Sequence, residues 1–199
     1  MDNHGQVMRP LRGRQNLSAD SYRPEGMAAI LWDHWHALQT TAGGAVPAKA
    51  ALSMRALKEA LPGLIICEVE QDGVVRIRLS GTRVDDMMGV PLTGRPVLDL
   101  TPPAQRTSID FVYRSIRQQP CGFYIFEDLA RRGGKMMALK ALLLPLTDRG
   151  GEVRFYVSAY QFGEGHYDPM IEDPPIIEHH TIVEAGFIDI GFGLPDENQ

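Results

Sequence analysis

Apolar and polar residues alternate in two short segments near the middle of the chain. Residues 64–70 and 74–80 are rich in β-branched and other apolar residues, and the loop between them contains Asp72 and Gly73. A period of two is typical of strands with one buried face, and Asp and Gly favour tight turns. The pattern therefore predicts an antiparallel β-hairpin.

The register of this hairpin follows from sorting its two faces. A two-residue turn would pair Val69 with Arg76 and mix apolar and charged residues, whereas a three-residue loop pairs Val69 with Val75. We expect the three-residue loop, because it separates the faces and Gly73 can adopt the left-handed conformation that the loop needs. The other pairs are then Cys67 with Ile77, Ile65 with Leu79 and, on the opposite face, Glu68 with Arg76.

The periodicity of the remaining chain predicts helices on both sides of this hairpin and then three strands. We expect an N-terminal helix over residues 24–39, a second helix from about Ser53, and a third opened by Thr101 and ending near Gln118. The strands are expected at residues 121–129, 136–146 and 153–162. This order predicts an α+β fold: a five-stranded antiparallel sheet with helices on one face, plus an N-terminal helix and a C-terminal extension.

Charge divides the chain unevenly. Its 199 residues include 20 Lys and Arg and 25 Asp and Glu, giving a net charge of −5, while residues 163–199 contain no Lys or Arg. We expect a flexible arm at 1–23, one domain at 24–162 and an acidic C-terminal extension at 163–199. The extension also holds many apolar residues, so we expect part of it to be ordered, as an added strand or as an arm across a dimer. An acidic chain is not expected to bind nucleic acid.

Several motifs of this sequence resemble those of a known family. Leu31-Trp32-Asp33-His34-Trp35 and Leu61-Pro62-Gly63 precede the hairpin, and Gly81-Thr82, Met88-Gly89 and Leu92-Thr93-Gly94-Arg95 follow it. Residues 24–162 resemble the stand-alone PAS-like family, of unknown function, that is common in alphaproteobacteria. The resemblance implies a sensory or protein-interaction module for signalling, without its own catalytic output, that acts on a protein partner.

A cavity between the sheet and the helices is a further implication of this resemblance. Its candidate residues share the apolar faces of the hairpin and of the third helix: Ile65, Cys67, Val69, Val75, Ile77, Leu79, Phe111, Val112 and Ile116. A packed core requires the same residues, so a filled interior stays open as an alternative. We expect any ligand to be small and mostly apolar, with one polar anchor.

The residues predict no cofactor, no metal site and no catalytic group. Haem needs an axial ligand, and the third helix contains no His. Cys67 and Cys121 occupy strand positions, where buried thiols are expected rather than the reactive Cys of a flavin photoreceptor. His34 and His36 are two residues apart on a helix and point in different directions. The adjacent pair His179-His180 is weak evidence for a metal site.

Two further features carry alternative interpretations. Arg95 follows a corner at Gly94, and we expect it to form a salt bridge with Asp99 or Asp85 that fixes the loop, with anion binding as the alternative. The apolar stripe with Leu31, Trp32 and Trp35 either covers the chain's own sheet or forms the interface of a homodimer, since Trp is frequent at interfaces.

Three functions remain open at this point. The first is the sensory module, the second is a small enzyme acting on a hydrophobic substrate through Glu127, Asp128 or Tyr124, and the third is a ligand-free dimerising adaptor. The chain shows no signal-peptide pattern and no apolar run long enough to cross a bilayer. We therefore expect a cytoplasmic protein that has a signalling partner and no membrane partner, and that forms a homodimer.

Overall fold

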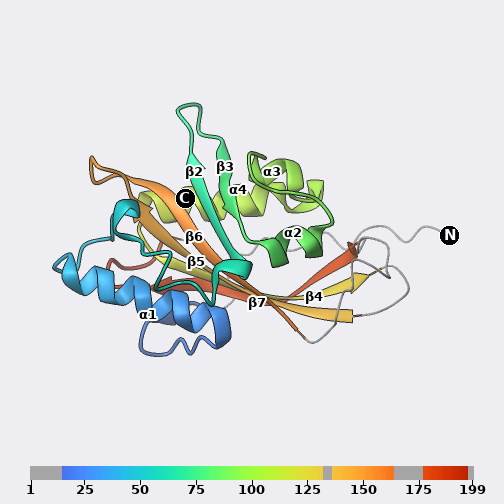
Figure 1. The fold of residues 1–199 in the computed structure, drawn as a ribbon, viewed down its shortest axis with the longest axis horizontal. Coiled ribbons are helices and arrows are strands. Elements are labelled where there is room, and N and C mark those ends of the chain that lie inside the picture. The colour runs from blue at the N-terminus through green and yellow to red at the C-terminus, as the bar shows by residue number, and fades with distance from the viewer. Residues whose placement is uncertain (1–14, 132–135, 164–176, 197–199) are drawn as a thin grey trace.

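The computed structural model describes residues 15–131, 136–163 and 177–196 (Figure 1). They form one seven-stranded sheet in the order β1-β7-β4-β5-β6-β2-β3. The strands are β1 (Leu17–Ser18), β2 (Leu64–Val69), β3 (Val75–Ser80), β4 (Gly122–Arg131), β5 (Met136–Thr147), β6 (Val153–Phe162) and β7 (Ile177–Asp189). The α-helices are α1 (Gly26–Thr41), α2 (Thr82–Met88), α3 (Val97–Leu100) and α4 (Arg106–Gln118).

The five expected strands are present as β2 to β6. Neighbouring strands among them are all antiparallel, and α4 is the expected crossover between the hairpin and the last three strands. Two more strands, β7 and β1, extend the sheet beyond β4, so the sheet has seven strands rather than five. The α+β class is confirmed.

The C-terminal extension supplies one of the added strands. β7 is antiparallel to β4, and its Ala185 and Ile188 are completely buried. The expected added strand is therefore present within the chain's own sheet. β1 pairs in parallel with β7 through Leu17 and Ile188, and Tyr22 is buried. Residues 15–23 are thus ordered, contrary to the expectation of a flexible arm at 1–23; residues 1–14 lie outside the described part.

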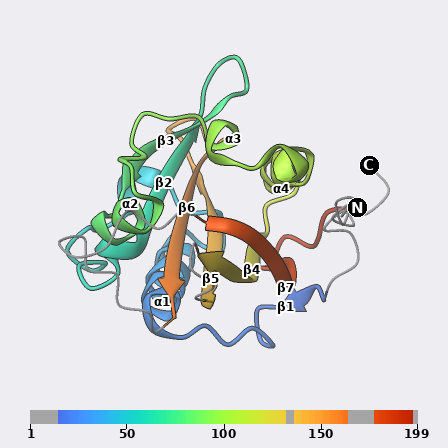
Figure 2. The ribbon, with the colours of Figure 1, turned by 90° about the vertical axis from the view of Figure 1, so that its right-hand side faces the viewer.

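The central strands are buried on both faces, because successive side chains of a strand point to opposite sides. Helices α2, α3 and α4 cover one face, which we call the cavity face, and α1 covers the other, which we call the α1 face (Figure 2). On β5, Leu143 points to the cavity face, whereas Leu142 and Leu144 point to the α1 face. Each face therefore has its own hydrophobic core.

Helix α1 is fastened to the sheet by Leu31 and Trp35, both completely buried. The Trp35 indole Nε1 donates a hydrogen bond to the carbonyl oxygen of Pro145 at 2.8 Å. Pro145 belongs to β5 and lies past the part of β5 that pairs with β4. The missing N–H of proline therefore breaks no hydrogen bond between these two strands, and the Pro145 carbonyl oxygen is free to accept a bond from a side chain. Leu31 and Trp35 are therefore core residues of their own chain, which is the first of the two alternatives for this stripe. A dimer interface near Trp32 stays a prediction.

The hairpin register is confirmed for three of its four expected pairs, and Gly73 has the expected positive φ of 85°. The fourth pair is wrong. A β-bulge between the partners of Ile66 and Cys67 leaves one extra residue in β3, so Ile65 pairs with Ser80 and Leu79 pairs with Ile66. Leu79 consequently packs with the core of the α1 face rather than on the cavity face.

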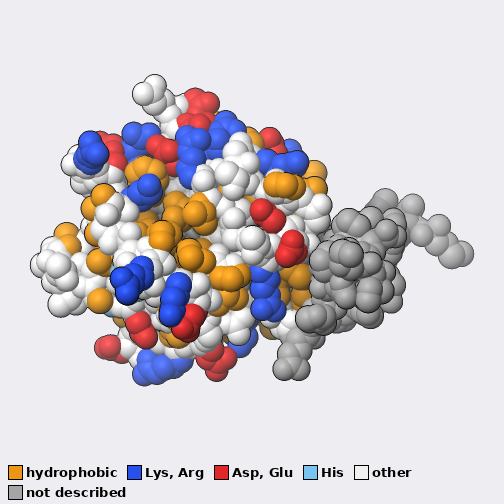
Figure 3. Space-filling model, viewed as in Figure 1, with side chains coloured by type: hydrophobic (Ala, Val, Ile, Leu, Met, Phe, Trp, Pro, Cys, Tyr) orange, Lys and Arg blue, Asp and Glu red, His pale blue; other side chains and the backbone are white. Residues whose placement is uncertain are grey.

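Ion pairs cover the exposed side of the hairpin. Arg76 binds both carboxylate oxygens of Glu70 at 2.8 Å, and Arg78 bridges Glu68 and Glu70. Positive and negative side chains are intermingled around β2 and β3 in Figure 3. Such pairs add little individually, but this network holds the hairpin face together. Elsewhere, residues 53–60 form turns instead of the expected second helix.

Substituting Trp35 tests how α1 is attached. Trp35→Phe removes the donor to Pro145 and leaves a buried carbonyl without a partner, which costs about 1–3 kcal/mol. Trp32→Phe is the matched control, because Trp32 lies on the same helix but is only partly buried. Urea unfolding measures both; equal losses in the two variants would contradict this attachment.

Substitutions in β7 test whether the C-terminal extension belongs to the fold. Ile188→Ala removes a fully buried side chain and is expected to destabilise the protein by about 2–5 kcal/mol. Val183→Ala, on the same strand at 56% exposure, is expected to change the unfolding free energy by less than about 0.5 kcal/mol. A negligible effect of Ile188→Ala on the urea midpoint would show that β7 is dispensable.

Candidate ligand cavity

A cavity of about 190 Å³ lies between the cavity face of the sheet and helices α2 to α4. Ala141 of β5 lies at the middle of its floor, between Ile125 on β4 and Tyr160 on β6. Leu139 and Leu143 precede and follow Ala141 on the same face. The short side chain of Ala141 therefore leaves a space, whereas the larger side chains of Leu139 and Leu143 fill the corresponding space on either side.

The roof of the cavity is apolar and comes from short elements. The residues concerned are Val84 and Met88 from α2, Leu92 from the following loop, Val97 and Leu100 from α3, and Ile109 and Val112 from α4. Of these, only Val112 is among the residues expected at the cavity. Segments of four to seven helical residues are too short for an apolar period to be recognised.

Most polar groups of the cavity are hydroxyls and a thiol. Tyr113 and Cys67 interact through their side chains, and burial raises the pKa of Tyr113 well above its usual value. Burial also raises the pKa of Cys67 to about 12, although the interaction with Tyr113 opposes this shift. Among the described lining residues there is no Lys, Arg or His. The interior therefore favours uncharged groups.

The nine residues expected at the cavity fall into four groups. Four line it: Ile65, Cys67, Ile77 and Val112. Val69, Val75 and Ile116 pack in the same core without lining the cavity, and Phe111 lies edge-on to Phe187, with ring centroids 6.3 Å apart. Leu79 is on the opposite face. Contact of the four lining residues with a ligand stays a prediction.

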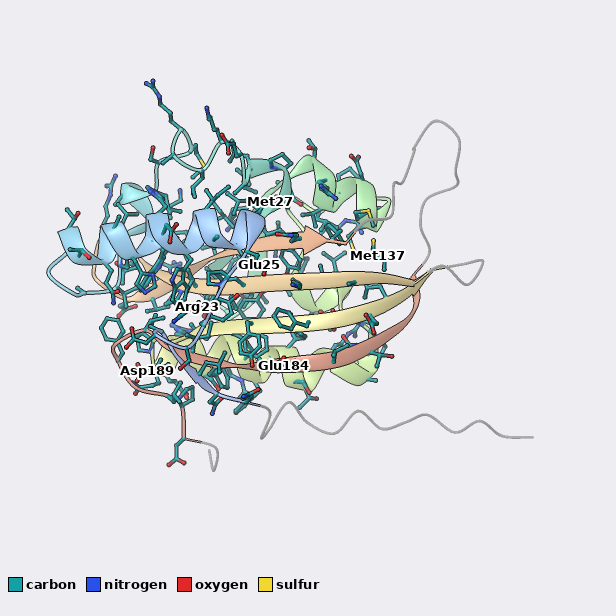
Figure 4. All side chains as sticks on the ribbon, turned by 90° about the horizontal axis from the view of Figure 1, so that it is seen from below. Arg23, Glu25, Met27, Met137, Glu184 and Asp189 are labelled. Atoms are coloured by element: carbon teal, nitrogen blue, oxygen red, sulfur yellow. The ribbon has the colours of Figure 1, made fainter. Side chains whose placement is uncertain are left out.

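The three residues considered for an enzyme are not brought together. Glu127 lines the cavity and is 8% exposed, whereas Asp128 is exposed on the α1 face. Tyr124 is also on the α1 face, where its hydroxyl donates a hydrogen bond to Glu184 Oε1 at 2.6 Å. Glu184 is labelled on β7 in Figure 4. Because successive side chains of β4 point to opposite faces, Tyr124 and Asp128 lie on the face away from the cavity that Glu127 lines.

The glycine-containing motif after the hairpin fixes the path of the chain. A Cβ on Gly81 would lie 2.3 Å from the carbonyl oxygen of Leu61, and Gly94 has a φ of 89° that other residues rarely adopt. The chain on either side of Gly94 pairs with the outer edge of β3, through Gly94 N–H to Ile77 O and Ile77 N–H to Arg95 O. The motif therefore closes a corner and covers a sheet edge.

The expected salt bridge of Arg95 is not found at this corner. Arg95 is exposed, and among the described residues it forms no ion pair with Asp99 or Asp85. Arg76 holds the corner instead, because its Nη1 donates to the carbonyl oxygen of Gly94 at 2.9 Å. Asp85 accepts the backbone N–H of Leu92 at 3.1 Å.

The histidines of α1 have hydrogen-bond partners within the chain. His36 bonds the Trp32 carbonyl through Nδ1, while His34 Nε2 accepts the Ser53 N–H, and burial lowers the pKa of His34. The described part of the chain contains no group of three potential metal ligands; the side chains of His179 and His180 lie outside it. At about 190 Å³ the cavity is also smaller than the roughly 300–1,000 Å³ of drug-sized ligand sites.

The strand order β3-β2-β6-β5-β4 with α2 to α4 over one face defines an α+β domain of the PAS type. Residues 25–160 match the family model of the PAS domain. This range is more than half of the chain, so the protein belongs to the PAS domain family. β1 and β7 lie outside the matched range.

Several solved structures match parts of the chain at low identity. The PAS domain of BvgS from Bordetella pertussis is 16% identical, with a TM-score of 0.44 over 59% of this chain and 88% of that one. A light-oxygen-voltage domain studied with a flavin analogue is 17% identical (TM-score 0.41, 54% and 82% covered). VqmA bound to DPO is 14% identical (0.40, 54% and 55%). No curated protein matches.

No described helix combines the length and the apolar character that crossing a bilayer requires.

The buried thiols give a test of the cavity interior. With a pKa of about 12, Cys67 is ionised at pH 8 in only about one molecule in ten thousand, and Cys121 is completely buried with its pKa also raised by burial. Ellman's reagent should therefore detect no rapidly reacting thiol in the native protein and two in urea. One fast native thiol would contradict the placement of these side chains.

Proposed function

We propose that this PAS domain is a sensory module that binds a small, mostly apolar molecule in the cavity and passes its occupancy to a protein partner, without catalysing a reaction. The observation that carries the proposal is the space above Ala141, which lies between the sheet and α2 to α4. Well-packed cores contain few voids of this size, so the space needs an explanation.

The volume sets the size of the molecule. An apolar cavity of about 150 Å³ holds benzene, so about 190 Å³ suits a single ring with one small substituent. The absence of Lys, Arg and His from the described lining supports an uncharged ligand, because a buried anion would lack a partner. The proposed ligand is therefore a neutral, ring-sized molecule.

The roof of the cavity provides the route from ligand to partner. α2 and α3 have seven and four residues, too few to be stable without packing. A ligand touching Val84 and Leu100 would add packing to both helices. The segment joining them, which includes Gly94, is bonded to β3, so its ordering is transmitted to the projecting β2–β3 hairpin. This supports the hairpin side as the output surface.

The proposal keeps the expected cytoplasmic homodimer with a signalling partner. The net charge of −5 supports protein rather than nucleic-acid partners. Because Leu31 and Trp35 are buried within the chain, a dimer would use other residues, and Trp32 is the member of that stripe that stays partly accessible.

Filling the cavity tests the proposal. Benzene at about five times its dissociation constant should raise the unfolding free energy of the wild type by about 1 kcal/mol. Ala141→Leu places a larger side chain in the cavity and should abolish that increase. Ala138→Leu is the matched control: Ala138 is on the same strand but exposed, so the increase should persist.

The comparison is made within each variant, by thermal unfolding with and without benzene. This removes the effect of each substitution on the fold itself. If benzene fails to stabilise the wild type, the interior is closed to ligands and the adaptor function is favoured. If Ala141→Leu keeps the whole increase, benzene binds elsewhere.

A further inference from the structure

Two hydroxyl groups on β6 face the cavity and have no hydrogen-bond partner among the described residues. Ser158 and Tyr160 are two residues apart, so both side chains point to the cavity face, and both line the cavity. Neither forms a hydrogen bond with any described residue, and Ser158 is only 2% exposed. The hydroxyl of Tyr156, on the same face of β6, is bonded: it donates to the Tyr113 carbonyl oxygen at 2.9 Å.

Unpaired polar groups inside a protein are costly, and most buried ones have a partner. The rest of the described lining around this pair is largely apolar, with Ile65 opposite Ser158 and Ala141 opposite Tyr160. The two hydroxyls thus form a small polar patch in the cavity wall, next to Ala141. A molecule bound there can supply the missing partner.

We propose that Ser158 and Tyr160 anchor the ligand, and that they select a neutral, ring-sized molecule carrying an oxygen or nitrogen acceptor. This inference rests on the proposed function and names the polar anchor of that site. Both hydroxyls donate to the acceptor, while the ring lies against Ala141 and the roof residues from α2 to α4.

The environment keeps Tyr160 in its donor form. Burial raises the pKa of Tyr160 above its usual value, and the nearby Cys67 and Glu127 raise it further. The phenol therefore stays protonated throughout the physiological pH range. An anionic ligand is disfavoured, since the described lining offers no cationic side chain.

Two probes of similar shape separate the anchor from simple apolar binding. Acetophenone has a carbonyl acceptor, whereas isopropylbenzene replaces it with a methyl group. Calorimetric titration of both gives the ratio of their dissociation constants, which cancels changes in cavity shape that affect the probes alike. Tyr160→Phe should weaken acetophenone about fivefold or more and leave isopropylbenzene unchanged or tighter.

The remaining variants distinguish anchoring from a structural effect. Ser158→Ala should shift the ratio in the same direction, and the double variant should shift it furthest. Tyr156→Phe is the matched control, because Tyr156 precedes them on the same face of β6 but its hydroxyl is bonded to Tyr113. It should leave the ratio unchanged.

Each outcome has a distinct meaning. If Tyr160→Phe and Ser158→Ala change both probes equally, or leave acetophenone unaffected, the anchor is overturned while binding in the cavity stands. If the wild type binds neither probe, the proposed function fails and the anchor fails with it. Urea unfolding of every variant confirms that the fold is intact.

Discussion

Burial of the central strands on both faces is the constraint on which the rest of this structure depends. Strands β4, β5 and β6 have apolar residues at successive positions, so neither face can be left to water. The chain covers one face with α1 and the other with α2 to α4. The hydrogen bond from Trp35 to Pro145 attaches α1 to the sheet. The motif around Gly94, which connects α2 with α3, is hydrogen-bonded to β3.

The two faces of the same strands are filled differently. On the α1 face, Leu142, Leu144 and Leu146 of β5 are completely buried, which is typical of a packed core. On the cavity face, Ala141 and the hydroxyls of Ser158 and Tyr160 replace large apolar groups at the centre. A small side chain and two polar ones leave a space that their neighbours do not close. The tightly packed core of the domain and its proposed binding site thus lie on opposite faces of the sheet.

Much of the fold is predictable from the sequence because it depends on local patterns. Alternation and turn residues predict β4, β5, β6 and the loop at Gly73 correctly. The position of Leu79 is not predictable in this way, because a β-bulge reverses the face of every later residue and leaves no mark in the pattern. Helix α1 shows a similar limit: its stripe identifies a buried face but does not say which surface buries Leu31 and Trp35.

The site was less predictable than the fold. Ile65, Cys67, Ile77 and Val112 follow from strand and helix periodicity, whereas the roof residues of α2 and α3 belong to elements too short to show a period. Ser158 and Tyr160 had a usable signal, since pairing Ser158 with Ile65 places both on one face. That pairing joins strands far apart in the chain, so predicting it requires knowledge of the strand order.

Xenon tests the central claim most directly, because it occupies apolar cavities that are accessible but unfilled. Diffraction from crystals under xenon pressure should show the gas bound beside Ala141, and a pressurised crystal without xenon there would contradict the account.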